Sequence, residues 1–276
     1  MYSSLTNAEL LAEVVAANAF PLFISTLLGA LALALALAWS WRVARPAGDP
    51  TPQRILAVGM SCMLPAGLLF LSLAGALSHR GALVTFDEAL AAALQATQPA
   101  ETLRAAALVT HFGDTATLTG LCVALAALLL VRGHHLLAAG WIAAVAGNSL
   151  LNVTLKSMFE RVRPIHEHGY TIETSWSFPS GHASGTVVAY GMAAYVLMRL
   201  LPARWHLPLL LLAVTIAMST AASRVVLQVH FASDVLAGIS SGTLWLSLCV
   251  MSQELLRRRP DGAPRPDPFP LDGDTQ

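Results

Sequence analysis

Charged residues are scarce in this sequence. Only 12% of its 276 residues are charged, whereas 55% are hydrophobic and the mean hydropathy is +0.62. Soluble domains carry about 25% charged residues, so the composition indicates a membrane protein. Sixteen basic residues balance sixteen acidic ones, and this zero net charge gives no reason to expect a nucleic-acid partner.

Cysteine is also rare. The three cysteines, Cys62, Cys122 and Cys249, all fall inside apolar runs, which predicts neither a disulfide nor a cysteine metal site. The first 19 residues contain no lysine or arginine and carry Glu9 and Glu13. We therefore expect no cleavable signal peptide.

Long apolar runs dominate the chain. A membrane-spanning helix needs about 20 mostly apolar residues, and seven segments meet this need: 20–41, 55–77, 115–132, 135–155, 181–201, 206–222 and 231–251. They predict an all-α fold, a polytopic bundle of transmembrane helices. We expect an N-terminal segment over 1–54 with one extra span, a membrane core over 55–256, and a disordered tail over 257–276 that is rich in Pro, Asp and Gly.

The positions of Lys and Arg predict the orientation, because cytoplasmic loops carry an excess of these residues. If the Pro179–His182 side faces out of the cytoplasm, ten of the sixteen basic residues lie on the inner side and six on the outer side. Three of those six, Lys156, Arg163 and Arg224, are candidates for the site described below. The N-terminus is then outside and the C-terminus is cytoplasmic.

The longest connection before the tail covers residues 79–114. Apolar and polar positions alternate with helical spacing from Phe86 to Ala96, so we expect an interfacial helix on the outer surface within 82–112. It could form a lid over the site or serve as a plain connection, and the pattern favours the connection.

Three short segments place reactive side chains at the ends of predicted spans. They are Lys156 to Pro164, Pro179 to His182, and Ser223 to Asp234. In the predicted topology all three emerge on the same face. Titratable groups that converge on one side of a membrane protein predict a functional site.

Five of these residues suit a phosphate. Arginine matches two phosphate oxygens with its planar fork, and lysine supplies a compact charge. The first turn of a helix, here the one that follows Pro179, carries free backbone N–H groups and a partial positive charge. The candidate phosphate ligands are Lys156, Arg163, Ser180, Gly181 and Arg224.

Two histidines and an aspartate supply the candidate catalytic groups. His230 and Asp234 are four residues apart, so on a helix they share one face and can hydrogen-bond. The carboxylate would fix the imidazole tautomer and free the other nitrogen to attack. His182 would act as general acid toward the leaving oxygen. This set suffices for phosphoryl transfer without a metal.

Simpler explanations exist for single residues. A lone histidine at the end of a span is more often structural, and Arg224 alone could be a snorkelling cation. His166-Glu167-His168 could bind a metal, but a solvated loop is favoured because the sequence places no third ligand. None of these explains why three separate segments place histidines, cations and a carboxylate on one side.

The three segments resemble the signature of the type 2 phosphatidic acid phosphatase family. The pattern is Lys, six residues, Arg-Pro; then Pro-Ser-Gly-His; then Ser-Arg, five residues, His, three residues, Asp, and the sequence fits it from Lys156 to Asp234. The resemblance implies a six-helix membrane core, a phosphohistidine on His230 oriented by Asp234, and protonation of the leaving group by His182. It also implies that the five candidate ligands hold the phosphate, that no metal or other cofactor is needed, and that the site faces the periplasm from a bacterial inner membrane.

The resemblance leaves the substrate open, since these motifs bind only the phosphate. The expected partner is a membrane lipid phosphate, with undecaprenyl diphosphate the leading candidate and phosphatidylglycerophosphate, phosphatidate or lipid A as alternatives. No protein partner is predicted. Two other functions stay open: a non-catalytic lipid carrier or flippase and, less favoured, a vanadate-dependent haloperoxidase.

Overall fold

The chain is mostly helical over the residues that the structure describes, and its longest non-helical connection lies between Phe159 and Gly181. This computed structural model describes residues 6–43, 51–79, 81–165, 169–171 and 173–257. No strand occurs in these ranges, which confirms the predicted all-α class. The helices are α1 (Asn7–Ala17), α2 (Ala19–Val43), α3 (Pro52–Ser78), α4 (Ala82–Thr97), α5 (Ala100–Thr110), η1 (His111–Gly113), α6 (Thr115–Val131), α7 (His135–Phe159), α8 (Gly181–Leu200), η2 (Ala203–Trp205), α9 (His206–Val226) and α10 (Ala232–Leu256).

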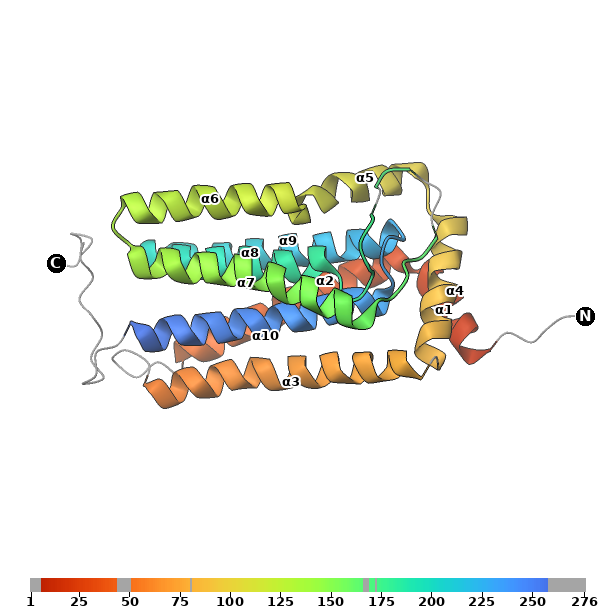
Figure 1. Ribbon diagram of the computed structural model, residues 1–276. Helices are drawn as coiled ribbons and strands as arrows, with labels where there is room; N and C mark the ends of the chain where they lie inside the picture. Colours follow the sequence, from red (N-terminus) through yellow and green to blue (C-terminus); the bar gives the residue numbers. More distant parts are fainter. Residues whose placement is uncertain (1–5, 44–50, 80, 166–168, 172, 258–276) are drawn as a thin grey trace, which may run out of the picture.

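The long helices form one bundle (Figure 1). Helices α3, α6, α7 and α10 run roughly along a common axis, whereas α4 crosses one end of the bundle beside α1. Seven segments of the described chain are long and apolar enough to cross a membrane, which agrees with the predicted number and includes the extra first span. They are Ala19–Ala36, Pro52–Ser78, Ala100–Val131, His135–Phe159, Gly181–Leu200, Ala203–Val226 and Ala232–Leu256.

The third of these segments corrects the prediction. A single surface helix was expected within 82–112, but the chain forms two helices there, and α5 continues through η1 into α6 as part of one spanning segment. The break lies at Gln98, whose ψ of 125° is extended, and Pro99, which precedes α5 with a ψ of 150°. A residue before proline avoids the helical region, so α4 ends there. The helix predicted from Phe86 to Ala96 is present as α4.

The outer surface of the bundle is apolar. Leu68 on α3, Val123 on α6 and Leu150 on α7 are 67%, 63% and 70% exposed. A soluble protein rarely exposes so many large apolar side chains together. The lipid tails of a bilayer are the environment in which such a surface is stable.

Glycines bring α8 and α10 together at the end of the bundle where the predicted site lies. A Cβ atom on Gly238 would lie 2.5 Å from the carbonyl oxygen of Ser180, and one on Gly242 would lie 2.9 Å from that of Ser184. Any larger residue would collide with backbone, which cannot rotate away. This close approach holds the start of α8 against the first turns of α10.

Candidate active site

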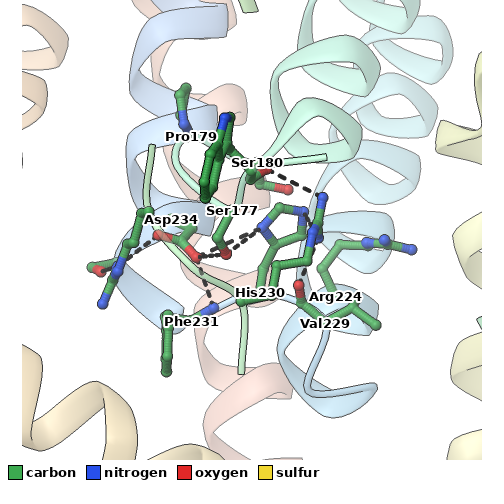
Figure 2. Close-up of polar contacts among 12 residues, drawn as sticks. Ser177, Pro179, Ser180, Arg224, Val229, His230, Phe231 and Asp234 are labelled. Carbon is green, nitrogen blue, oxygen red and sulfur yellow. Dashed lines mark hydrogen bonds and ion pairs between the residues drawn. The ribbon is translucent and has the colours of Figure 1, made fainter. Parts of the chain in front are cut away.

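The three predicted segments meet at the end of the bundle that α4 crosses (Figures 1 and 2). Arg163 of the first segment contacts His230 of the third, with Nη1 3.0 Å from Nε2. The Ser180 N–H of the second segment donates to the carbonyl oxygen of Asp234 at 2.9 Å. Residues that are up to 78 positions apart in the sequence therefore form one polar cluster.

Two residues in the left-handed region shape the chain around the cluster. Glu160, with φ 44° and ψ 36°, ends α7 just after Lys156 and turns the chain toward Arg163. Gln228 has a φ of 49° in the turn between α9 and α10. In that turn the N–H groups of Val229 and His230 both donate to the Arg224 carbonyl oxygen, at 3.2 and 3.3 Å. Both non-glycine residues adopt an unfavourable conformation at the site, which the surrounding structure must hold.

His230 is buried, and its contacts define its tautomer. Its Nε2 lies 3.0 Å from Arg163 Nη1, and its Nδ1 lies 3.4 Å from Ser177 Oγ. Arginine only donates hydrogen bonds, so Nε2 accepts and the proton belongs on Nδ1. Burial, reinforced by the charges of Arg163, Arg224 and Lys156, lowers the pKa of His230 well below its ordinary value. The imidazole is therefore neutral near pH 7, with the Nε2 lone pair facing the cations.

Asp234 reaches His230 less directly than predicted. Its Oδ2 lies 3.6 Å from His230 Nδ1, and that oxygen instead accepts from Ser177 Oγ at 2.5 Å and from the Phe231 N–H at 2.9 Å. The prediction placed His230 and Asp234 on one helical face, but α10 begins only at Ala232. Ser177 consequently lies between the two groups, as Figure 2 shows.

Arg163 and Lys156 are gathered by the chain that precedes α8. Arg163 Nη1 donates to the Val229 carbonyl at 2.7 Å and its Nε to the Ser175 carbonyl at 2.7 Å. Lys156 Nζ donates to Ser175 Oγ at 2.9 Å and to the Trp176 carbonyl. Both cations line a cavity of about 460 Å³. The two predicted ligands thus face one space.

Arg224 is fully buried and carries a free donor. Its Nη1 donates to Thr110 Oγ1 at 2.6 Å and its Nη2 to Glu173, but its Nε–H has no hydrogen-bond partner among the described residues. A buried charged donor without a partner is costly and calls for an acceptor. A phosphate oxygen is such an acceptor.

Glu173 was missed by the sequence reasoning and lies inside the cationic cluster. One carboxylate oxygen bonds to Arg224, and the other is 3.5 Å from Arg163 Nη2. Burial alone would raise the pKa of Glu173, but the guanidinium groups of Arg224 and Arg163 lower it below its ordinary value. The carboxylate is therefore ionised and acts as a counter-ion to two of the predicted phosphate ligands.

His182 has a carboxylate partner that was also not predicted. Its Nε2 lies 3.0 Å from Asp114 Oδ1, while Asp114 Oδ2 lies 2.7 Å from His111 Nδ1. Asp114 precedes α6 but makes no side-chain capping bond to that helix. Its carboxylate instead serves the two histidines, and this contact orients the His182 ring.

Ser180 and Gly181 shape the start of α8. The Ser180 hydroxyl caps the helix by accepting from the Ala183 N–H at 3.4 Å. A Cβ atom on Gly181 would lie 2.9 Å from Asn152 Oδ1 on α7. The absence of a side chain at Gly181 therefore lets α7 and α8 approach, while the hydroxyl of Ser180 is occupied as a helix cap.

The groups that sequence reasoning missed lie outside the three motifs or between their fixed positions. Arg161 lies between Lys156 and Arg163, and Ser233 lies between His230 and Asp234, so both stand inside a motif at positions that its pattern does not fix. The others are brought in by the fold: Asp87, Thr110, Asp114, Glu173, Ser175 and Ser177.

The metal alternative rests on residues that the structure leaves out. His166-Glu167-His168 lie outside the described residues. Within the described ranges, no group of three or more His, Cys, Asp and Glu side chains is arranged to hold a metal ion.

The comparisons with known proteins agree with one another. Residues 137–258 match the model of the PAP2 superfamily. Phosphatidylglycerophosphatase B of Bacillus subtilis (strain 168) is 32% identical over 198 residues, which cover 69% of this chain and 94% of that protein. Lipid A 1-phosphatase of Rhizobium etli is 32% identical over 178 residues, which cover 55% of this chain and 71% of that protein.

A solved structure gives the same result. The crystal structure of a transmembrane PAP2-type phosphatidylglycerolphosphate phosphatase from Bacillus subtilis matches with a TM-score of 0.66 and 32% sequence identity, over 71% of this chain and 97% of that chain. Fold, spans and relatives define an enzyme class, the membrane-embedded lipid phosphate phosphatases. The chain belongs to the PAP2 superfamily, which confirms the family suggested by its motifs.

Proposed function

We propose that this enzyme removes a phosphate from a membrane lipid phosphate or diphosphate through a phosphohistidine on His230. One observation carries the proposal: the buried neutral imidazole turns Nε2 toward Arg163, while Nδ1 faces Ser177 and Asp234. A nitrogen nucleophile needs an unprotonated lone pair and a cationic surrounding for the phosphate it attacks. His230 has both, and its lone pair becomes available when a phosphate oxygen takes the Arg163 Nη1 donor in its place.

In the first step the substrate phosphate takes the place of Glu173 beside Arg163 and Arg224. The Nε2 atom of His230 attacks phosphorus, forming an N–P bond while the bond to the leaving oxygen breaks. His182, oriented by Asp114, gives its proton to that oxygen. Charge that develops on the phosphoryl oxygens is stabilised by Lys156 and the two arginines.

In the second step a water molecule attacks the phosphohistidine. His182 takes a proton from this water as it attacks, so the residue returns to its starting state. The N–P bond breaks, and inorganic phosphate leaves as His230 recovers its lone pair. Asp234, through Ser177, holds Nδ1–H in place in both steps and stabilises the charge that forms on the ring.

The position of the site suits a lipid. Val153 and Ile165 lie on either side of the segment that bears Lys156 and Arg163, and Val162 lies within it; they are 65%, 86% and 73% exposed. A substrate can therefore keep its chains against apolar surface while its phosphate enters the cluster. The two relatives act, by name, on phosphatidylglycerophosphate and lipid A. For this enzyme undecaprenyl diphosphate is our leading substrate, with phosphatidylglycerophosphate and phosphatidate next.

The orientation belongs to the same proposal. Because basic residues concentrate at the opposite end of the chain's spans, the site faces the periplasm from a bacterial inner membrane and the C-terminus is cytoplasmic. Residues 1–54, with the first span, precede the family core over 55–256.

The test is release of inorganic phosphate by the detergent-purified protein in the presence of EDTA. We would compare undecaprenyl diphosphate, phosphatidylglycerophosphate, phosphatidate and a soluble phosphate ester, using wild type, His230→Ala and His79→Ala. His79 is exposed at the same end of the bundle, which makes it a matched control. Release that is lost only in His230→Ala supports the proposal. Retained release in that variant rejects His230 as nucleophile, and no release from any substrate favours a lipid carrier.

A further inference from the structure

Arg161 is held in a closed set of contacts beside the proposed nucleophile. Its Nη1 donates to Asp234 Oδ1 at 2.6 Å and to Ser233 Oγ at 2.7 Å, and its Nη2 donates to Asp87 Oδ2 at 2.8 Å. Its guanidinium carbon also lies 4.2 Å from the centre of the Phe231 ring, a cation–π distance. One planar fork thus joins two carboxylates from different helices.

Asp87 comes from α4, far from the family motifs in sequence. Its side chain is fully buried, and its two oxygens accept from the Ser233 N–H at 3.2 Å, from the Ser233 hydroxyl and from Arg161. Burial raises the pKa of Asp87, with the bonds from Ser233 and Arg161 opposing that rise. A buried carboxylate needs such partners, and here the partners adjoin Asp234.

These contacts fix the orientation of the Asp234 carboxylate. Arg161 occupies Oδ1, while Ser177 and the Phe231 N–H occupy Oδ2. A carboxylate with both oxygens bonded on opposite sides cannot rotate without breaking strong charge-assisted bonds. The oxygen that faces His230 Nδ1 is therefore kept in place by a residue that does not touch the histidine.

We propose that Arg161 and Asp87 are positioning residues for catalysis: Asp87 holds the Arg161 fork, and Arg161 fixes Asp234 so that it orients His230. This inference rests on the proposed role of His230 as nucleophile. Arg161 lines the same cavity as Lys156 and Arg163, but its described hydrogen bonds go to Asp87, Ser233 and Asp234. Its fork is therefore committed to the two carboxylates, and we expect the loss of either residue to affect turnover more than anion binding.

A simpler role must be separated from this one, since the same bonds also fasten α4 to the bundle. If these bonds were only a structural tie, their loss would lower the stability and every activity of the protein together. The fall in kcat would then add to the fall caused by losing Asp234. A positioning role acts through Asp234 alone. If Asp234 has already been replaced, removal of Arg161 should therefore cause little further fall in kcat.

The experiment measures kcat, KM and the orthovanadate inhibition constant of the purified protein with the substrate that releases phosphate fastest. For Arg161→Ala and Asp87→Asn we expect kcat to fall about 10- to 100-fold, as for other residues that orient a reacting group, while the vanadate constant changes less than about threefold. Arg161→Lys, which keeps the charge without the fork, recovers part of kcat. Arg104→Ala and Glu88→Gln, at exposed positions on α5 and α4, are controls expected to match wild type.

The decisive comparison adds Arg161→Ala to Asp234→Asn. We expect the double variant to lie within about threefold of Asp234→Asn alone, because interacting residues are non-additive. The inference is overturned if Arg161→Ala lowers kcat by the same factor in the Asp234→Asn background as in wild type. It is also overturned if Arg161→Ala alone has a normal kcat. If Arg161→Ala does not fold, the comparison is made with Asp87→Asn and Arg161→Lys. Retained turnover in His230→Ala is a different result, because it rejects the proposed nucleophile itself.

Discussion

Glu173 gives the sharpest prediction about the proposed phosphate site. Its carboxylate bonds to Arg224 and lies 3.5 Å from Arg163, so an anionic ligand must replace it. Glu173→Gln keeps the shape of the side chain and removes its charge. The variant should therefore bind phosphate analogues more tightly than wild type.

The magnitude follows from the bonds that change. A hydrogen bond to a charged group contributes about 1.5–3 kcal/mol, and the uncharged glutamine carbonyl can keep a weaker bond to arginine of about 1 kcal/mol. The anion then displaces an interaction weaker by about 0.5–2 kcal/mol, which corresponds to a roughly 2- to 30-fold lower inhibition constant. Because the pKa of Glu173 is already lowered by the two arginines, the gain should persist from about pH 5 upward.

Orthovanadate inhibition of phosphate release provides the assay. The exposed Glu101 at the start of α5 supplies the matched control, Glu101→Gln, which should leave the constant unchanged. A vanadate inhibition constant for Glu173→Gln equal to or above that of wild type would refute the reasoning. It would mean that the carboxylate orders the arginines for the anion and does not compete with the anion.

Three further predictions concern the proposed nucleophile and the structure around it. Ser177→Ala removes the hydroxyl between Asp234 and His230, so kcat should fall about tenfold; unchanged kcat would exclude a role for this bridge. Gly238→Ala forces a Cβ to within 2.5 Å of a backbone carbonyl oxygen and should cost about 1–3 kcal/mol, seen as a lower thermal midpoint in detergent, whereas Gly75→Ala, with open space around it, should not. The pKa of His230 is lowered on folding, so the unfolded chain binds this proton more readily; the contribution of His230 to stability is complete above about pH 6.5 and declines as the pH falls below that value. A thermal midpoint measured from pH 8 to pH 5 should show that decline, and His230→Ala should lose it.

The sequence predicted the spans and the motif residues because both depend on local patterns. Twenty apolar residues in a row need only be counted, and the spacing from Lys156 to Arg163 is visible in one segment. The apolar pattern places the start of the third span too late in the chain, because Glu101, Arg104 and Asp114 lower the hydropathy of α5 and the turn after it. Its start depends on packing against α9, which no local pattern reveals.

The counter-ions of the site were missed for a related reason. Asp87 and Ser233 are 146 positions apart and meet only in the folded chain, and Glu173 lies in a connection with no helical pattern. The contact between His230 and Asp234 was predicted from helical spacing, but the histidine precedes the helix that bears the aspartate. A spacing of four residues fixes a shared face only when both residues lie within the same helix.

The sequence allows helix α4 to be either a lid or a plain connection, and its contacts favour the connection. A lid must open at small cost, so it should be held by weak and exposed contacts. Asp87 is instead buried against Arg161, and Leu90 and Leu94 pack on α1. Moving α4 away would separate the buried Asp87 carboxylate from Arg161 and Ser233, which are its partners, and this is strongly unfavourable. These contacts favour a helix α4 that stays in place during turnover, and we expect the substrate to enter from another side.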